Sequence, residues 1–231
     1  MANILNIDSS SPRCSVSISI DGETIVGYES GETMDHSRTL ATYAVKCIKF
    51  ADEKGIKLEA VSVSNGPGSY TGLRIGLSLA KGICYGRNIP LITLSTLEVL
   101  AVRAMFSYEG LEGDEIIVPM VDARRMEVFT GAFNCRLEEV AESGPRILNE
   151  EAFAELASKP KILFIGTGTE KFKPLYAGEN GEWLGEETSH AKFMAVLSEK
   201  HYREGKFADI AYSTPFYLKE YQTTKPKNKV I

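Results

Sequence analysis

Hydrophobic and polar residues alternate along the first thirty residues in the manner of β-strands. Residues 4–8 form an apolar run, and from Cys14 to Ile20 every second residue is apolar while the residues between are serines. Strict alternation is typical of a strand with one buried face. Asp21-Gly22 suits a hairpin turn, and residues 24–29 form the returning strand. The pattern therefore predicts strands over 4–8, 14–20 and 24–29.

The period of the pattern changes after this hairpin. From Ser37 to about Lys54, apolar residues recur every three or four positions, which predicts an amphipathic helix, and Gly55 fits a C-terminal cap. Further along we predict a strand over 61–63, a helix over 71–85 and a strand over 89–94. Strands mixed with helices in this way predict an α/β lobe.

The second part of the chain repeats this opening. We predict a helix over 96–106, a polar loop up to Glu115, and strands over 116–122 and 126–133. A helix over 149–157, a strand over 161–165 and a helix over 191–203 complete it. We therefore expect an N-terminal lobe of residues 1–100 and a smaller, looser C-terminal lobe of residues 101–231.

Asp8 and Asp122 occupy similar positions in the two lobes. Each closes an apolar strand and precedes a turn and a returning strand. This similarity predicts an internally duplicated protein. Two unrelated hairpins that happen to look alike remain the alternative.

Composition limits the classes of function. The 231 residues are 43% hydrophobic and 25% charged, which is ordinary for a globular protein, and the net charge of −5 argues against binding nucleic acid by electrostatics alone. No apolar run reaches the about 18 residues of a membrane span, and the N-terminus does not resemble a signal peptide, so we expect a cytoplasmic protein. Four well-separated cysteines, none in a C-x-x-C pair, are expected to be buried apolar residues.

A glycine-rich segment over residues 64–82 is the most distinctive stretch. Its turn lies between a predicted strand and helix, where phosphates often bind, but it lacks the lysine of a P-loop and the spacing of a dinucleotide fingerprint. Within the helix, Gly72, Gly76 and Ala80 are spaced i, i+4, i+8. Each helical glycine costs about 1 kcal/mol relative to alanine, so the stripe predicts close approach of another backbone. That backbone could belong to this chain or to a partner.

Several motifs together resemble the TsaB (YeaZ) family. They cover residues 4–125 densely and the remainder thinly. These motifs are Ile4-Leu-x-Ile-Asp8-Ser-Ser, His36-Ser37, Gly66-Pro-Gly68-Ser-Tyr-Thr-Gly72-Leu-Arg74-Ile-Gly76, Ala80-Lys-Gly82, Ile89-Pro90-Leu, Ser95-Thr-Leu-Glu98, Val121-Asp122-Ala-Arg124-Arg125 and Pro215-x-Tyr217-Leu.

The resemblance implies a two-lobe actin/Hsp70-like (ASKHA, ribonuclease H-like) fold and an accessory role in making threonylcarbamoyladenosine in tRNA. It implies a TsaD-like catalytic paralogue and a TsaE-like ATPase as partners, a homodimer when the chain is alone, and contact with tRNA only through the complex. The partner is expected to bind the two N-lobe helices. The predicted interface residues are Leu40, Ala44, Cys47, Gly72, Leu73, Gly76, Ala80 and Ile83.

The residues themselves agree with a protein that has no chemistry of its own. A phosphate-binding hairpin needs glycine after its Asp, but Asp8 is followed by three serines and Pro12, which has no amide donor. We interpret five residues as remnants of a degenerate nucleotide site: Asp8, Ser9, Asp122, Gly166 and Gly168. For Gly166 and Gly168, an ordinary turn is the alternative and the preferred interpretation. We predict no catalytic residue, no metal and no cofactor in this chain, with ATP and metal on the partner subunits.

The three histidines, His36, His190 and His201, are not at metal-ligand spacing. His36 and Ser37 are expected to cap the first helix. The rival hypothesis is a stand-alone ATP-dependent phosphotransferase of the same fold; a peptidase is a weaker third. A basic tail with Lys219, Lys225, Lys227 and Lys229 is expected to increase solubility, with contact to tRNA phosphates as the alternative.

Overall fold

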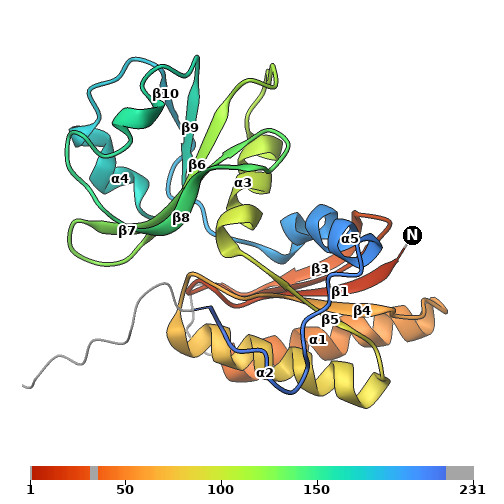
Figure 1. Cartoon of the computed structure of the whole chain (residues 1–231). Coiled ribbons are helices and arrows are strands. Elements are labelled where there is room, and N and C mark those ends of the chain that lie inside the picture. Colours follow the sequence, from red (N-terminus) through yellow and green to blue (C-terminus); the bar gives the residue numbers. More distant parts are fainter. Residues whose placement is uncertain (1, 32–35, 217–231) are drawn as a thin grey trace, which may run out of the picture.

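Two five-stranded sheets, one in each lobe, organise the computed structural model, which describes residues 2–31 and 36–216 (Figure 1). The sheet of the N-terminal lobe has the order β3-β2-β1-β4-β5, and that of the C-terminal lobe has the order β8-β7-β6-β9-β10. The strands are β1 (Asn3–Asp8), β2 (Ser15–Ile20), β3 (Glu23–Glu29), β4 (Ala60–Ser64), β5 (Leu91–Leu94), β6 (Ile116–Asp122), β7 (Glu127–Asn134), β8 (Glu139–Ile147), β9 (Ile162–Ile165) and β10 (Gly181–Trp183).

The two sheets share one topology. In each, the first three strands form an antiparallel meander, and the last two strands continue the sheet in parallel from the first strand of the meander. β1 and β6, which end at Asp8 and Asp122, are therefore central in their sheets. The repeated topology supports the internal duplication over two unrelated hairpins.

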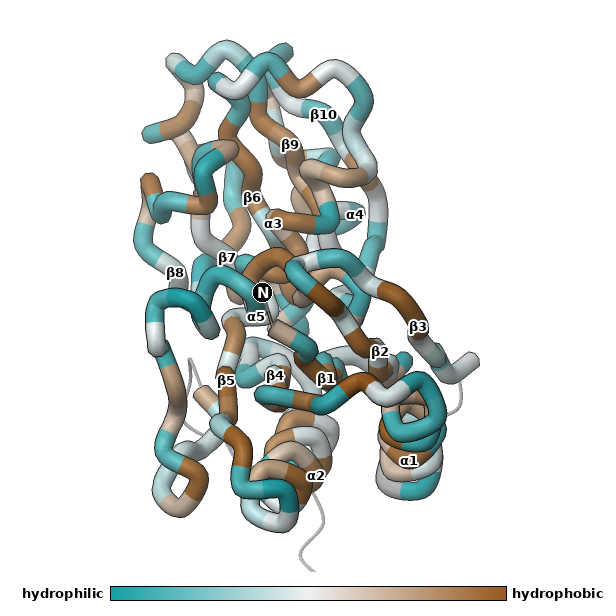
Figure 2. Tube along the Cα trace, turned by 90° about the vertical axis from the view of Figure 1, so that its right-hand side faces the viewer, coloured by the Kyte–Doolittle hydropathy of each residue, from teal (hydrophilic) through white to brown (hydrophobic). Residues whose placement is uncertain are grey.

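Helices cover both faces of the N-lobe sheet (Figures 1 and 2). On one face, α1 (His36–Glu53) and α2 (Tyr70–Arg87) lie side by side. On the other face lie the short η3 (Ala191–Met194) and α5 (Ala195–Arg203), while α3 (Thr96–Ser107) lies between the two lobes. The C-lobe carries α4 (Thr169–Phe172) and the single turns η1 (Ala154–Leu156) and η2 (Lys173–Leu175).

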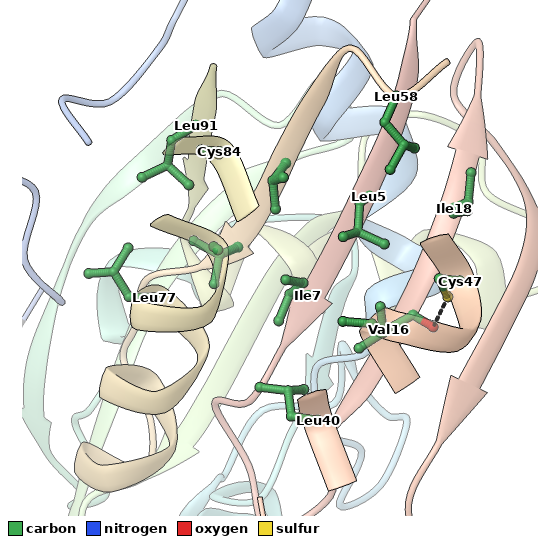
Figure 3. Packing of buried hydrophobic residues seen from close by; sticks show 14 of the residues in the cluster. Leu5, Ile7, Val16, Ile18, Leu40, Cys47, Leu58, Leu77, Cys84 and Leu91 are labelled. Carbon is green, nitrogen blue, oxygen red and sulfur yellow. Dashed lines mark hydrogen bonds between the residues drawn. The ribbon is translucent and has the colours of Figure 1, made fainter. Parts of the chain in front are cut away.

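The largest N-lobe core lies between the sheet and the helices α1 and α2 (Figure 3). The sheet contributes residues such as Leu5 and Val16, α1 contributes Leu40 and Cys47, and α2 contributes Leu77 and Cys84. The thiol of Cys47 donates to the carbonyl of Val16 over 3.8 Å. As expected from the sequence, Cys14, Cys47 and Cys84 are buried; Cys135 is half-buried.

The sequence position of the last helix, α5, suggests that it belongs to the C-lobe. In the structure it packs on the N-lobe instead. Its buried residues and those of η3 form a core with the N-lobe sheet: Ala2, Ile4, Ala60, Ile92, Leu94, Val99, Val102, Ala191, Met194 and Leu197. Ser198 donates through Oγ to Asn6 Oδ1 over 2.6 Å, and Glu199 Oε2 accepts from the Ala2 amide over 3.1 Å. The chain therefore returns to the first lobe after completing the second.

The expected boundary at residue 100 falls inside a helix. Val99 and Val102 of α3 pack in the core beneath α5, whereas Leu97 and Ala101 pack against the C-lobe sheet. One helix thus contributes to both lobes, and no cut at a single residue separates them.

The prediction was weakest in the C-lobe. The helix expected over 149–157 is only the single turn η1, and β8, β10 and α4 were not predicted. In β8, half-buried and exposed residues do not alternate cleanly, and Gly144 and Pro145 interrupt the apolar pattern. Local periodicity does not predict a strand in such a segment. The strand forms because the segment pairs with β7.

Candidate functional site

The glycine-rich turn brings α2 against the turn between β1 and β2. The Ser69 amide donates to the Ser10 carbonyl over 2.7 Å, and Ser9 Oγ donates to the Gly72 carbonyl over 2.8 Å. Ser69 also caps α2, because its Oγ accepts from the Gly72 amide over 3.2 Å. These contacts fix the start of α2 against the turn that follows Asp8.

The glycine stripe serves this close approach. A Cβ at Gly72 would collide with the Ser9 carbonyl oxygen, and a Cβ at Gly76 would collide with Ser9 Oγ. Gly68 is similarly constrained by the Ser10 carbonyl. The sequence left open whether the approaching backbone belongs to this chain or to a partner. The structure shows that it belongs to this chain.

The predicted partner interface is consequently wrong at most of its residues. The residues concerned are buried within the N-lobe rather than at its surface: Leu40, Ala44, Cys47, Gly72, Leu73, Gly76 and Ala80. Ile83 is half-buried and packs against the same core, so its role stays a prediction. The apolar period identified which residues are buried, but it could not show that the sheet of the same chain covers them.

The opposite face of the two helices is open. Val45 on α1 is 50% exposed and Tyr85 on α2 is 84% exposed. A Cβ at Gly82 or Gly86 would meet no atom within 4 Å. Together with the exposed Ser78, these glycines form a second small-residue stripe at spacing i, i+4, i+8. The spacing of this stripe is present in the sequence, but the interface was predicted at the stripe of Gly72 and Gly76 instead.

The carboxylate of Asp8 is buried; its Oδ1 is hydrogen-bonded within the N-lobe, whereas its Oδ2 has no hydrogen-bond partner in the described part of the chain. Its Oδ1 accepts from the Ser10 amide over 2.9 Å, from Ser10 Oγ over 2.8 Å and from Ser64 Oγ over 2.8 Å. The neighbouring Ser9 amide donates to Ser64 Oγ over 3.3 Å. Amides that would wrap a phosphate are therefore occupied by side chains of this lobe.

Asp122 is neutralised in a corresponding way. Its Oδ1 accepts from Lys171 Nζ over 2.6 Å and from the Arg124 amide over 2.7 Å. Lys171 also donates to the carbonyls of Arg125 and Glu127. A lysine of α4 thus closes the second turn and compensates the charge of the Asp122 carboxylate.

Gly166 and Gly168 are explained by packing. Gly166 has φ +115° and a Cβ there would collide with the Met120 carbonyl, while a Cβ at Gly168 would crowd Val128. Their amides donate to the carbonyls of Gly185 and Met120, over 3.0 and 3.1 Å. Both glycines form an ordinary turn against β6, and their origin as nucleotide-site remnants stays a prediction.

A cleft of about 620 Å³ separates the lobes at these turns. Both turns contribute residues to it, together with the first residues of α2 and α3 and the segment that leads back to the N-lobe. Its lining comprises Ser10, Ser11, Pro12, Pro67, Gly68, Ser69, Tyr70, Thr71, Thr96, Leu100, Val121, Asp122, Ala123, Arg124, Phe129, Thr167, Glu187, Thr188 and Ser189. Of the five predicted remnants, only Asp122 lines this cleft.

Other candidate chemistry is sparse in the described part of the chain. Burial raises the pKa of the Cys47 and Cys84 thiols to about 12, so these thiols are not reactive at neutral pH. Within residues 2–31 and 36–216, no three His, Cys, Asp or Glu residues gather in a metal-binding arrangement, and no helix has the length and apolar character to cross a membrane. The proposed cap by the side chains of His36 and Ser37, and the basic tail with Lys219, Lys225, Lys227 and Lys229, lie outside the described residues.

Comparison with a family model decides the family. Residues 32–229 match the model described as TsaD, tRNA N6-adenosine threonylcarbamoyltransferase. The chain belongs to this family, in its TsaB (YeaZ) branch. It is 29% identical over 222 residues to the Bacillus subtilis tRNA threonylcarbamoyladenosine biosynthesis protein TsaB, covering 94% of this chain and 93% of the relative. The Escherichia coli protein of the same name is 26% identical and covers 94% of each chain.

Solved structures show the same fold. A Pseudomonas aeruginosa protein described as similar to the peptidase YeaZ superposes with a TM-score of 0.79 at 22% identity, covering 95% of this chain and all of the other. YeaZ from Pseudomonas aeruginosa gives a TM-score of 0.74 at 23% identity, covering 94% of this chain and all of the other. A hexokinase of the ROK type from Thermus thermophilus gives 0.50 at 11% identity, with 88% and 100% coverage. The fold is the two-lobe actin/Hsp70-like architecture expected from the sequence.

Proposed function

We propose that this chain is a non-catalytic accessory subunit for the synthesis of threonylcarbamoyladenosine in tRNA. In this role it binds a TsaD-like catalytic paralogue, is joined by a TsaE-like ATPase, contacts tRNA only through the complex and works in the cytoplasm. The names of its relatives support the pathway. The observation that supports the non-catalytic role is that side chains of the same chain occupy both turns: Asp8 Oδ1 accepts from the Ser10 amide and Ser64 Oγ, and Asp122 pairs with Lys171.

ATP and metal belong to the partner subunits in this proposal. A phosphotransferase of this fold would need free amides at its phosphate-binding turn, but the Ser9 amide donates to Ser64 Oγ, the Ser10 amide donates to Asp8 Oδ1, and Pro12 has no amide donor. At the second turn, Lys171 pairs with Asp122. We expect no low-micromolar binding of ATP, with or without Mg²⁺, in a calorimetric titration of the isolated chain. Low-micromolar binding would favour the rival phosphotransferase.

The surface proposed for the paralogue is the open face of α1 and α2, defined here by Val45, Ser78, Gly82, Tyr85 and Gly86. The two helices are neighbours, and the five residues of this face are three small ones on α2 and the exposed Val45 and Tyr85. Small residues let the helices of a partner approach closely, as in helix bundles. The same face would hold a second copy of the chain in a homodimer.

The test is a pair of substitutions at Gly82. Gly82→Leu and Gly82→Ala should both stabilise α2 by about 1 kcal/mol, because glycine is a poor helix former and the site is open. Only Gly82→Leu adds a bulky side chain to the proposed surface. We expect it to weaken paralogue binding at least tenfold in a titration, equal to about 1.4 kcal/mol, and to lower tRNA modification by the reconstituted complex. Gly82→Ala is the matched control, with a much smaller effect.

A further outcome would contradict the surface. If Gly82→Leu binds the paralogue with wild-type affinity, the interface lies elsewhere. If it binds normally but modification is lost, the chain acts in the chemistry and the accessory role is wrong.

A further inference from the structure

We propose that a pocket at the start of α3 binds an organic cation, an ammonium or guanidinium group carried on a short apolar stem. The pocket lies where the ends of β4 and β5, the first turn of α3, the β7–β8 hairpin and Phe216 come together. Its volume of about 330 Å³ is at the lower end of the range of small-molecule sites. No residue of the helix face proposed for the paralogue lines it, so the two proposals can fail independently.

The helix α3 separates this pocket from the interlobe cleft. Ser95 and Glu98 line the pocket, whereas Thr96 and Leu100 line the cleft, and no residue lines both. Positions three or four apart share a face of a helix, while positions two apart, such as Thr96 and Glu98, do not. The pocket and the cleft are therefore on different sides of α3.

The charges of the pocket favour a cation. Glu98 and Glu139 both line it, and the described residues of the lining include no lysine, arginine or histidine. Lys200 and Lys206 are close enough to act on Glu98, but neither lines the pocket, and Lys206 is paired with Glu204 over 2.7 Å. A bound cation would therefore lie beside two carboxylates, with no cationic side chain in the described lining to oppose it.

Glu98 is held at the pocket by the first turn of its own helix. Its carboxylate accepts a hydrogen bond from the Ser95 amide, and Ser95 Oγ accepts from the Leu97 amide over 3.2 Å, as in a capping box. Burial nevertheless raises the pKa of the Glu98 carboxyl above its ordinary value, and Glu139 adds to this effect, although the Ser95 amide and two lysines oppose it. A cation bound beside Glu98 would stabilise the charged form of this carboxyl.

Asn65 supplies an acceptor that has no donor. Its backbone is fixed, because its amide donates to the Leu94 carbonyl and its carbonyl accepts from the Phe216 amide, both over 2.8 Å. Its side-chain oxygen Oδ1 is shielded from solvent and has no hydrogen-bond partner in the described part of the chain. Buried polar atoms are normally paired, so this oxygen indicates a ligand that donates. Ammonium and guanidinium groups carry donors and no acceptor, which matches a pocket lined by acceptors.

Apolar side chains line the rest of the pocket. Leu94 and Phe133 are almost fully buried, Leu137 is half-buried and Phe216 is 58% exposed. Aromatic rings also attract a cation that lies against their faces. The expected ligand therefore has an apolar stem beside its charged group. A free amine and a basic side chain of another protein share this chemistry.

The test is an NMR titration of the full chain at neutral pH with benzylamine, which is protonated there, and with the uncharged benzyl alcohol of nearly equal size. We expect benzylamine to bind about tenfold more tightly, with the largest chemical-shift changes at Asn65, Glu98 and Phe133. A third probe, Nα-acetyl-lysine N-methylamide, distinguishes the two sources. Binding comparable to that of benzylamine would identify a basic side chain of a protein, and much weaker binding would identify a free amine.

Substitutions in the pocket complete the test. Because glutamine also completes a capping box, Glu98→Gln should keep the melting temperature of the wild type while weakening benzylamine binding about tenfold. Asn65→Ala removes the unpaired acceptor and should weaken binding several-fold. Glu170→Gln is the matched control, since it removes the same charge from the exposed start of α4, and it should bind as the wild type does.

Three results would overturn the proposal. Benzyl alcohol could bind as tightly as benzylamine, or neither cationic probe could bind at about 10 mM. The third is that Glu98→Gln and Asn65→Ala both bind benzylamine as tightly as Glu170→Gln does.

Discussion

At the scale of single residues, Asp8 and Asp122 are two carboxylates at matching positions of the two lobes that interact with groups of the same chain. Each ends the first strand of its sheet. Asp8 Oδ1 accepts from two serine hydroxyls and an amide, while its Oδ2 has no hydrogen-bond partner in the described part of the chain. Asp122 is paired with a lysine instead, so matching positions of the two lobes have different local environments.

His190 gives a residue-scale prediction about pH. Burial lowers the pKa of His190 below its ordinary value, and the nearby Glu29, 3.6 Å from Nε2, only partly opposes this. The unfolded chain therefore takes up a proton at higher pH than the folded chain. Stability should fall as pH decreases through about 6.5 towards the lower pKa of the folded state. We expect urea unfolding of His190→Gln to show a smaller loss of stability between pH 7.5 and 5.5. An unchanged pH slope would contradict the effect of burial.

At the scale of elements, the two faces of α2 carry separate tasks. The inner face holds Gly72 and Gly76 against Ser9, and the outer face holds Gly82 and Gly86 in open space. On the inner face a close contact requires glycine. On the outer face no contact within the described part of the chain requires it. Gly82 and Gly86 therefore lower the stability of α2, and no contact within the described part of the chain explains why glycine occupies these positions.

Gly76→Leu tests the inner face. Leucine there would push α2 away from the turn after β1, because its Cβ alone collides with Ser9 Oγ. We expect a loss of at least 1–3 kcal/mol in the free energy of unfolding, typical of overpacking, measured in urea. Gly82→Leu is the matched control and should gain stability. If Gly76→Leu were as stable as the wild type, the helix would not be docked as described.

At the scale of the whole molecule, the chain crosses between the lobes twice. It leaves the N-lobe through α3 and returns through residues 186–190 to η3 and α5, which cover the second face of the first sheet. The Glu199 side chain and the Ala2 amide join residues near the two ends of the described chain. The N-terminal lobe is therefore built from two separate stretches of the chain.

Leu197→Ala tests this arrangement. Leu197 is buried against the N-lobe sheet, and its removal should cost about 2–5 kcal/mol, as for other large-to-small core changes. Val196→Ala, at the neighbouring and exposed position, should change stability little. Amide hydrogen exchange should show the loss of protection in β1 and β5, although both strands lie far from residue 197 in sequence. Loss of protection confined to the C-lobe would contradict the placement of α5.

The sequence by itself determined the local elements and the family. The strand over 116–122 has the predicted bounds, the helix predicted over 71–85 spans Tyr70–Arg87, and the resemblance to TsaB is confirmed by relatives of that name. These features depend on periodicity, turn residues and short motifs, all of which act over a few neighbouring positions.

Only the tertiary structure decided what each face contacts. Leu40, Cys47 and Gly76 have the pattern of an interface, yet they are covered by their own sheet and turn, and α5 packs on a strand that begins the chain. The closure of Asp122 by Lys171 likewise joins residues 49 positions apart. Periodicity shows that a side chain is buried, but the partner that buries it comes from long-range packing, which a single sequence does not encode at any one position.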